Sequence, residues 1–214
     1  VQTSSPQVNI LLSTFNGETY LSPLLDSLLV QTHQDFHIIA RDDGSEDHTP
    51  DILKKYRLKN PGRITLLPSR HLGINRSFQQ LLGHAPSPYI MFCDQDDIWF
   101  PDKVQKSIDR MQEAERLWGS RTPILVHTDL KVCSRELNIL AESYWKYSGI
   151  KPARNNFHRV LAQNMVHGCT VMINQPLAEL CREIPSDAVM YDWWLALTAS
   201  CFRKITAIEE PTLL

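Results

Sequence analysis

The first half of the chain alternates between short apolar runs and longer segments whose apolar residues recur three and four positions apart. The runs that fit buried strands are 8–14, 36–40, 64–67 and 89–93. The periodic segments that predict helices are 20–29, 51–58 and 74–82. Strands that alternate with helices indicate right-handed βαβ units, so we expect an α/β fold with a mostly parallel sheet flanked by helices.

The second half is less regular. Pro101 suits a first helical position, and Val104, Ile108, Met111 and Trp118 follow it at helical spacing. Strands are predicted at 124–128 and 170–173, and a polar, aromatic-rich segment over 137–164 lies between them. We expect this segment to shape an acceptor pocket.

Length and composition favour one catalytic domain. A chain of 214 residues with 43% hydrophobic content can bury a sizeable core, and no linker rich in Pro, Gly or Ser divides it. We expect residues 1–214 to form that domain, with a nucleotide-binding half over about 1–100 and an acceptor-binding half over about 101–214. Because the chain begins at Val1 and stops just after a predicted strand and turn, we expect it to be truncated at its C-terminus.

Charge and cysteine usage exclude several classes of protein. The 22 Lys and Arg residues nearly balance the 24 Asp and Glu residues, which argues against nucleic acid as a partner. Five cysteines without C-x-x-C spacing argue against a disulfide framework and a cysteine zinc site, and favour the cytoplasm. No apolar run reaches the length needed to span a bilayer.

Three carboxylates, Asp94, Asp96 and Asp97, follow the run 89–93 within four positions. Their mutual repulsion suggests that a cation binds among them, and Mg²⁺ or Mn²⁺ with a phosphorylated ligand is the first candidate. A solvated acidic turn is the simpler alternative.

Polar and acidic residues also follow two other predicted strands, at 13–18 and 42–45. In an open α/β sheet, ligands bind beyond the carboxyl ends of the strands, so these segments should meet the acidic turn at one edge. For Ser45 and Asp47 we favour a turn and helix-cap role. Glu18 fits either a helix start or a ligand contact. Arg76 and its neighbours Arg70 and His71 fit a diphosphate site or a solvated loop equally well.

Five ordered motifs resemble those of glycosyltransferase family 2, which has the GT-A fold, and in particular its bacterial rhamnosyltransferase-like members. The resemblance covers nearly the whole chain. The motifs are Thr14-Phe15-Asn16-Gly17-Glu18, Asp42-Asp43-Gly44-Ser45, Gly73-Ile74-Asn75, Cys93-Asp94-Gln95-Asp96-Asp97-Ile98-Trp99 and Tyr191-Asp192-Trp193-Trp194.

The resemblance implies a role for residues in each motif. Asp96 matches the metal ligand for Mn²⁺ or Mg²⁺, Asp192 the catalytic base, and Asp97 a loop or donor-sugar position. The expected nucleotide-sugar-binding residues are Thr14, Phe15, Asn16, Glu18, Asp42, Arg76, Asp94 and Gln95. Among them, Thr14, Phe15 and Asp42 match positions around the base, and Asp94 a position near the ribose.

The expected reaction is direct displacement with inversion at the anomeric carbon. A metal stabilises charge on the leaving nucleoside diphosphate, and a carboxylate takes the proton of the acceptor hydroxyl. From local sequence alone, Asp192 also fits an ordinary helix N-cap. We expect at most one of Trp193 and Trp194 to stack on a sugar ring.

The implied donor is a nucleoside-diphosphate sugar, linked to dTDP or UDP, with rhamnose as one candidate sugar. The implied acceptor is a saccharide or lipid-linked intermediate of cell-surface polysaccharide synthesis, reached at the inner face of the cytoplasmic membrane by peripheral contact. The alternatives are a sugar nucleotidyltransferase, a phosphohydrolase using Asp94 and Asp96, and a non-catalytic nucleotide-sugar binding module. The first needs a glycine-rich basic loop, which 13–18 lacks.

Overall fold

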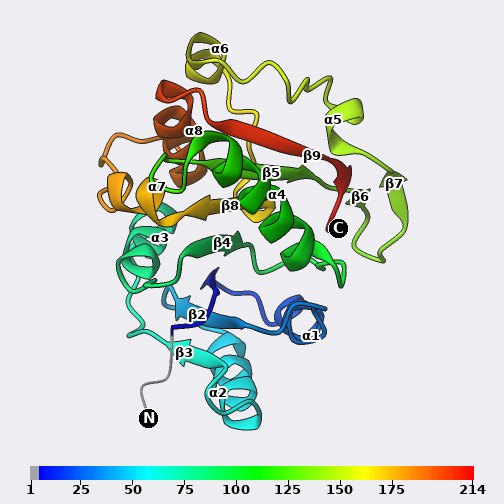
Figure 1. Cartoon of the computed structure of the whole chain (residues 1–214). Helices are drawn as coiled ribbons and strands as arrows, with labels where there is room; N and C mark the ends of the chain where they lie inside the picture. Colours follow the sequence, from blue (N-terminus) through cyan, green and yellow to red (C-terminus); the bar gives the residue numbers. More distant parts are fainter. Residues whose placement is uncertain (1–4) are drawn as a thin grey trace.

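The structure, a computed structural model that describes residues 5–214, is built on a seven-stranded sheet of order β3-β2-β1-β4-β8-β5-β9 (Figure 1). The strands are β1 (Val8–Thr14), β2 (Phe36–Asp42), β3 (Ile64–Leu66), β4 (Tyr89–Cys93), β5 (Leu125–Asp129), β8 (Val171–Asn174) and β9 (Ile205–Pro211). Neighbouring strands are parallel except at β8, which is antiparallel to both β4 and β5. The predicted mostly parallel α/β sheet is confirmed.

The central strands are largely buried because helices cover both faces of the sheet. All seven residues of β1 are buried, as expected of a parallel strand packed on both sides. Successive side chains point to opposite faces, so Val8, Ile10 and Leu12 enter one core and Leu11 enters the other.

The helices divide between the two faces. Within residues 5–214 the α-helices are α1 (Leu21–Leu29), α2 (Thr49–Lys59), α3 (Ile74–Gly83), α4 (Lys103–Trp118), α5 (Tyr144–Tyr147), α6 (Phe157–Ala162), α7 (Gln175–Leu180) and α8 (Tyr191–Cys201). Helices α1, α2 and α4 share one core, and α3, α6, α7 and α8 share the other. Within residues 5–214, no helix combines the length and the apolar character needed to cross a bilayer.

The segment over 137–164, which the sequence pattern left irregular, is ordered by local capping. It contains β7 (Ile139–Ala141), which pairs with β6 (Val132–Cys133), and the short helices α5 and α6. The Ser143 side chain caps α5 by accepting from Lys146 N, and the Asn156 side chain caps α6 by accepting from Arg159 N. These caps start helices too short to show apolar periodicity.

The last residues of the chain pair with the segment that follows the acidic turn. Ile98 N donates to Leu214 O at 3.1 Å, and Leu214 N donates back to Ile98 O at 2.9 Å. The buried Lys103 Nζ donates to Thr212 Oγ1 at 3.1 Å. This pairing fixes the exit of the acidic turn from the sheet.

Candidate active site

A cavity of about 400 Å³ opens at the carboxyl ends of β1, β2 and β4. The starts of α3 and α8 close its other sides. It is lined by Ser13, Thr14, Phe15, Asp43, His71, Gly73, Ile74, Asp94, Gln95, Asp96, Met190, Tyr191 and Asp192. The loop after β1, the acidic turn and the segment around Asp192 therefore meet, although they lie far apart in the sequence.

The three carboxylates of the acidic turn have different surroundings. Asp96 is exposed and lines the cavity, so its oxygens are accessible to an ion. Asp94 is half-buried; burial, and then the charges of Asp96 and Asp192, raise its pKa to about 6. Asp97 is buried behind the turn, where its Oδ2 accepts from Asp94 N at 3.2 Å.

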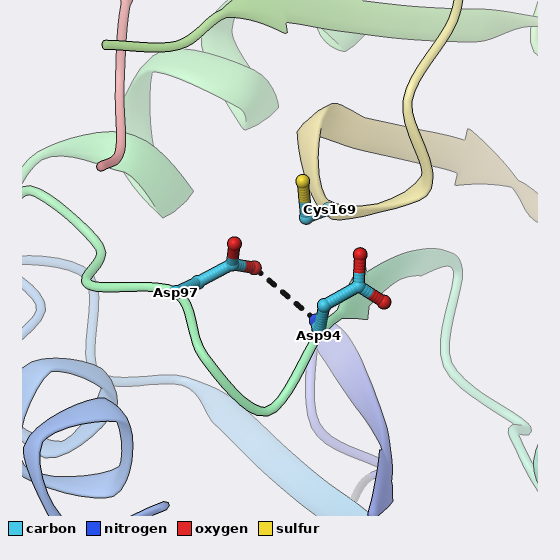
Figure 2. Close-up of side chains that lie close together, drawn as sticks. All are labelled: Asp94, Asp97 and Cys169. Carbon is cyan, nitrogen blue, oxygen red and sulfur yellow. Dashed lines mark hydrogen bonds between the residues drawn. The ribbon is translucent and has the colours of Figure 1, made fainter. Parts of the chain in front are cut away.

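Behind the turn, ligand-type atoms of Asp94, Asp97 and Cys169 all lie within 4.8 Å of one another (Figure 2). Burial, and then the charges of Asp97 and Asp94, raise the pKa of the Cys169 thiol well above its usual value. Burial likewise raises the pKa of Asp97. A thiol is a soft ligand, whereas Mg²⁺ and Mn²⁺ prefer oxygen ligands, so this cluster is better explained as packing that supports the turn.

The side chains that line the cavity suit a divalent cation. Its wall carries Asp43, Asp94, Asp96 and Asp192, with His71 as the one basic side chain among the lining residues. Hard cations prefer carboxylate and phosphate oxygens, and Asp96 offers an accessible carboxylate. The residues present therefore fit a metal held by Asp96 together with a phosphorylated ligand.

Asp192 lies in the first turn of α8, where it is buried and lines the cavity. Its Oδ1 accepts from Asn164 Nδ2 at 3.1 Å, and its Oδ2 accepts from Gly168 N at 2.9 Å. Burial raises the pKa of Asp192 although these hydrogen bonds favour the ionised form. Met190 is the N-cap of α8, so the N-cap alternative for Asp192 is not what the structure shows.

Two residues whose roles the sequence did not predict hold Asp192 in place. Asn164 reaches it from the loop after α6, and Gly168 from the turn before β8. Any side chain at Gly168 would collide with the Tyr191 hydroxyl, which lies closer than real Cβ contacts allow. Tyr191 is fully buried and stacks on Phe78 with ring centroids 4.0 Å apart. Glycine is therefore required at position 168 for close packing against α8.

Gln95 lines the cavity but uses its side chain to tie two strand ends together. Its Oε1 accepts from Phe15 N at 2.8 Å, and its Nε2 donates to Phe15 O at 2.9 Å. Phe15 itself is 46% exposed, and its ring lies 5.4 Å from that of His71. The exposed ring is thus held at the cavity wall by Gln95.

The sequence favoured Asp42 as a ligand-binding residue, but in the structure Asp43 lines the cavity and Asp42 does not. The Asp42 carboxylate accepts from Thr14, Gly44, Ser45 and Ser69 and does not line the cavity. Its predicted contact with a base stays a prediction.

Asp43 does line the cavity. Burial acts to raise its pKa, but hydrogen bonds from Arg41, Leu72 N and Gly73 N outweigh burial and hold the pKa below its usual value. The signal in the sequence was the second acid beside Asp42, at the end of a predicted strand.

Asn16 and Glu18 bond to the neighbouring loop. Asn16 Oδ1 accepts from Glu46 N at 3.0 Å, and Glu18 Oε2 accepts from His48 N at 3.0 Å. The Asp47 carboxylate accepts from Glu18 N at 3.0 Å and from Thr49 N at 2.9 Å, but the N-cap residue of α2 is His48 rather than Asp47.

Three other predicted contacts lie outside the cavity lining. Arg76 is exposed and donates to Gln79 Oε1 at 3.5 Å. Trp193 and Trp194 line a separate apolar hollow beside Val189, and Trp193 Nε1 donates to Val160 O at 2.5 Å. The structure therefore does not bring these side chains to the acidic turn.

Solved structures share this fold. S. aureus TarS 1–349 in complex with UDP-GlcNAc superposes with a TM-score of 0.71 over 97% of this chain and 57% of that one, at 17% identity. The mannosyltransferase PcManGT from Pyrobaculum calidifontis, in complex with GDP-Man and Mn²⁺, gives a TM-score of 0.70 over 98% of this chain and 56% of that one, at 18% identity. The predicted GT-A fold is confirmed.

Curated relatives point in the same direction. The dTDP-rhamnosyl transferase RfbG of Shigella flexneri is 36% identical over 103 residues, which are 46% of this chain and 36% of that protein. An uncharacterised glycosyltransferase of Nostoc sp. is 29% identical over 51% of this chain and 34% of its own length. The matched region spans only about a third of each of these two relatives.

The family model for glycosyl transferase family 2 matches residues 9–181, a region that begins in β1 and ends just after α7. It contains four of the five motifs on which the resemblance rested; the fifth, at Asp192, lies beyond it. The chain belongs to glycosyl transferase family 2.

Proposed function

We propose that this chain transfers a sugar from a nucleoside-diphosphate sugar to an acceptor hydroxyl by single displacement with inversion. The observation that carries the proposal is the placement of Asp96 and Asp192 in one cavity. One is exposed and suited to a metal, and the other is buried and suited to a base. The reaction needs both kinds of carboxylate at one centre.

The proton transfer is assigned to Asp192. The acceptor oxygen forms a bond to the anomeric carbon while the bond from that carbon to the diphosphate oxygen breaks, and the hydroxyl proton passes to the Asp192 carboxylate. Burial makes this carboxylate more basic than an exposed one, and Asn164 and Gly168 fix its orientation. A single displacement inverts the anomeric configuration and needs no covalent nucleophile.

Asp96 is assigned as the ligand of Mn²⁺ or Mg²⁺. When bound, the metal supplies stabilisation of the negative charge that develops on the leaving diphosphate. The neighbouring Asp94 lines the same wall, and a bound cation would favour its ionised form against the burial that raises its pKa. Mn²⁺ in the PcManGT complex supports a divalent metal in proteins of this fold.

The nucleotide is assigned to the side of the cavity formed by the ends of β1 and β2. Phe15 and His71 offer ring faces there, and Asp43 offers a carboxylate for a base or ribose donor. The UDP-GlcNAc and GDP-Man complexes of the two structural neighbours support a nucleoside-diphosphate sugar as donor. The Shigella relative supports dTDP-rhamnose as one donor to test.

The acceptor is assigned as a saccharide or a lipid-linked saccharide of cell-surface polysaccharide synthesis. Such an acceptor would be met at the inner face of the cytoplasmic membrane through peripheral contact. The sugar nucleotidyltransferase alternative is disfavoured because the β1 loop is held by Gln95, Ser45 and Thr49 and carries no basic residue.

The test is a donor screen followed by a turnover assay. Because a ligand that binds only the native state raises its stability, thermal shift with dTDP-, UDP- and GDP-sugars in the presence of Mn²⁺ should single out one donor. Slow release of nucleoside diphosphate from that donor should then depend on Asp96 and Asp192. A chain that binds the donor without releasing nucleoside diphosphate would instead be a binding module.

A further inference from the structure

A second cavity, of about 330 Å³, lies on the acceptor half between the loop after α5 and the helix α6. Lys151, Arg154 and Arg159 line it together with the polar side chains of Ser148 and Gln163. No carboxylate contributes to its lining. No step of the proposed reaction involves this cavity.

The sequence around this cavity is depleted of negative charge. Residues 143–178 contain no Asp or Glu, in a chain whose acidic residues otherwise slightly outnumber its basic ones. Within residues 5–214, Lys151, Arg154 and Arg159 form no ion pair. Three cations that converge on one cavity without a counter-charge repel one another, and an anion would relieve that repulsion.

Two basic residues in a surface hollow between α4 and β9 are paired with carboxylates. Lys106 and Arg110 line that hollow together with four carboxylates. Lys106 pairs with Glu210 at 2.9 Å, and Arg110 pairs with Glu113 at 2.7 Å. The cavity beside α6 differs because its cations have no such partners.

The backbone around the cavity is held by specific contacts. Ile150 packs against the core shared by α3 and α8, and its amide donates to Trp145 O at 2.8 Å. Asn155 Nδ2 donates to Ile205 O at 3.0 Å, which attaches the loop to β9. The three cations are therefore presented by an ordered loop and helix.

The cavity lies beside residues that contact Asp192, the proposed base. Gln163 and Met165 line it, and between them lies Asn164, whose amide donates to Asp192. On α6, Val160 O accepts from the Nε1 of Trp193, the residue directly after Asp192. A ligand in this cavity is thus bound beside the segment that holds the base.

We infer that this cavity binds a phosphate group carried by the acceptor, and that Lys151, Arg154 and Arg159 supply the charge that recognises it. Arginine side chains suit phosphate because their planar groups donate paired hydrogen bonds. Such binding anchors the acceptor on the side of α6 while its hydroxyl reaches Asp192. The inference rests on the proposed function and adds a chemical class to its acceptor.

The test compares the triple variant Lys151→Gln, Arg154→Gln, Arg159→Gln with the charge-matched control Lys55→Gln, Arg57→Gln, Lys59→Gln on α2. The probe is inorganic phosphate, titrated by NMR into the metal-free chain while the amides of residues 148–163 are followed. We expect saturable shifts at these amides in the unmodified chain and the control. The triple variant should bind phosphate about tenfold or more weakly, because several charge-assisted hydrogen bonds are lost. All six side chains are exposed, so melting temperatures should confirm that both variants remain folded.

A second arm distinguishes phosphate on a soluble acceptor from lipid headgroups. The unmodified chain is sedimented with phosphatidylcholine vesicles that contain or lack phosphatidylglycerol. Sedimentation with anionic vesicles but no response to phosphate would make the cavity a membrane contact and overturn the inference. Equal phosphate binding by the triple variant, or an equal loss in the control, would also overturn it. Release of nucleoside diphosphate by the unmodified chain is measured separately, so the proposed function and this inference can fail independently.

Discussion

The side-chain amide of Gln95 closes a pair of hydrogen bonds with the backbone of Phe15, at 2.8 Å to its N and 2.9 Å to its O. The pair joins the acidic turn to the end of β1 across 80 positions of sequence. A side chain in the middle of the acidic turn therefore orients the loop that presents the Phe15 ring at the cavity wall.

Gly17→Ala should displace Gln95, because a Cβ at position 17 would overlap the Gln95 amide. We expect Gly17→Ala and Gln95→Ala each to lower the free energy of unfolding by about 0.5–1.5 kcal/mol, through the lost hydrogen bonds to the Phe15 backbone. Both should weaken donor binding. Chemical denaturation and donor titration of the single and double variants measure the coupling.

The double variant should be little worse than either single variant, since each removes the same pair of bonds. Additive losses would show that Gly17 and Gln95 act independently, contrary to the geometry.

Gly168→Ala should disturb Asp192, the proposed base, without substituting it. The new methyl group collides with Tyr191, whose displacement moves the start of α8 and the Gly168 N–H that Asp192 accepts. We expect a loss of about 1–3 kcal/mol in unfolding free energy from overpacking, together with a large fall in kcat. Denaturation midpoints and initial rates measure the two effects.

Gly83→Ala is the matched control for that substitution. Gly83 is the last residue of α3, and a Cβ there would meet nothing within 4 Å. Alanine at a helical position should be neutral or stabilising by up to about 1 kcal/mol. Equal damage from both substitutions would contradict the packing account.

The pH dependence of turnover should report Asp192. Because its pKa is raised above the ordinary 3.8, the proton-accepting form is lost at a higher pH than for an exposed aspartate. We therefore expect the rate to fall as pH decreases through that raised pKa, and kcat/KM measured across pH at saturating Mn²⁺ to show the limb.

Asn164→Ala should move this acidic limb to still higher pH. The substitution removes a hydrogen bond that favours the ionised carboxylate, so the pKa of Asp192 should rise further. A purely structural role for Asn164 would lower the rate at every pH and leave the limb where it is.

The features that the sequence could predict are those that local sequence patterns determine. Apolar runs located the strands, and the ends of those strands located the cavity, because parallel strands bring their carboxyl ends to one edge. The exposed Asp96 and the buried Asp192 were both found in this way or through the family motifs.

What the sequence could not supply depends on contacts between distant segments. The roles of Gly168 and Asn164 require α8 to pack beside the turn before β8, across 24 and 28 positions. The antiparallel direction of β8 depends on the path of the chain through α5 and α6. These helices are too short to show apolar periodicity in the sequence. Trp193 and Trp194, predicted near a sugar, line a neighbouring apolar hollow because the helix turns them away from Asp192.

Release of nucleoside diphosphate from the donor selected by thermal shift, in the presence of Mn²⁺, is the decisive assay for the proposed roles of Asp96 and Asp192. It is made on the unmodified chain, Asp96→Ala and Asp192→Asn, with melting temperatures as the control for folding. We expect slow release by the unmodified chain, loss of its Mn²⁺ dependence together with most of the rate in Asp96→Ala, and donor binding without release in Asp192→Asn. Release at an unchanged rate by both folded variants would contradict these roles.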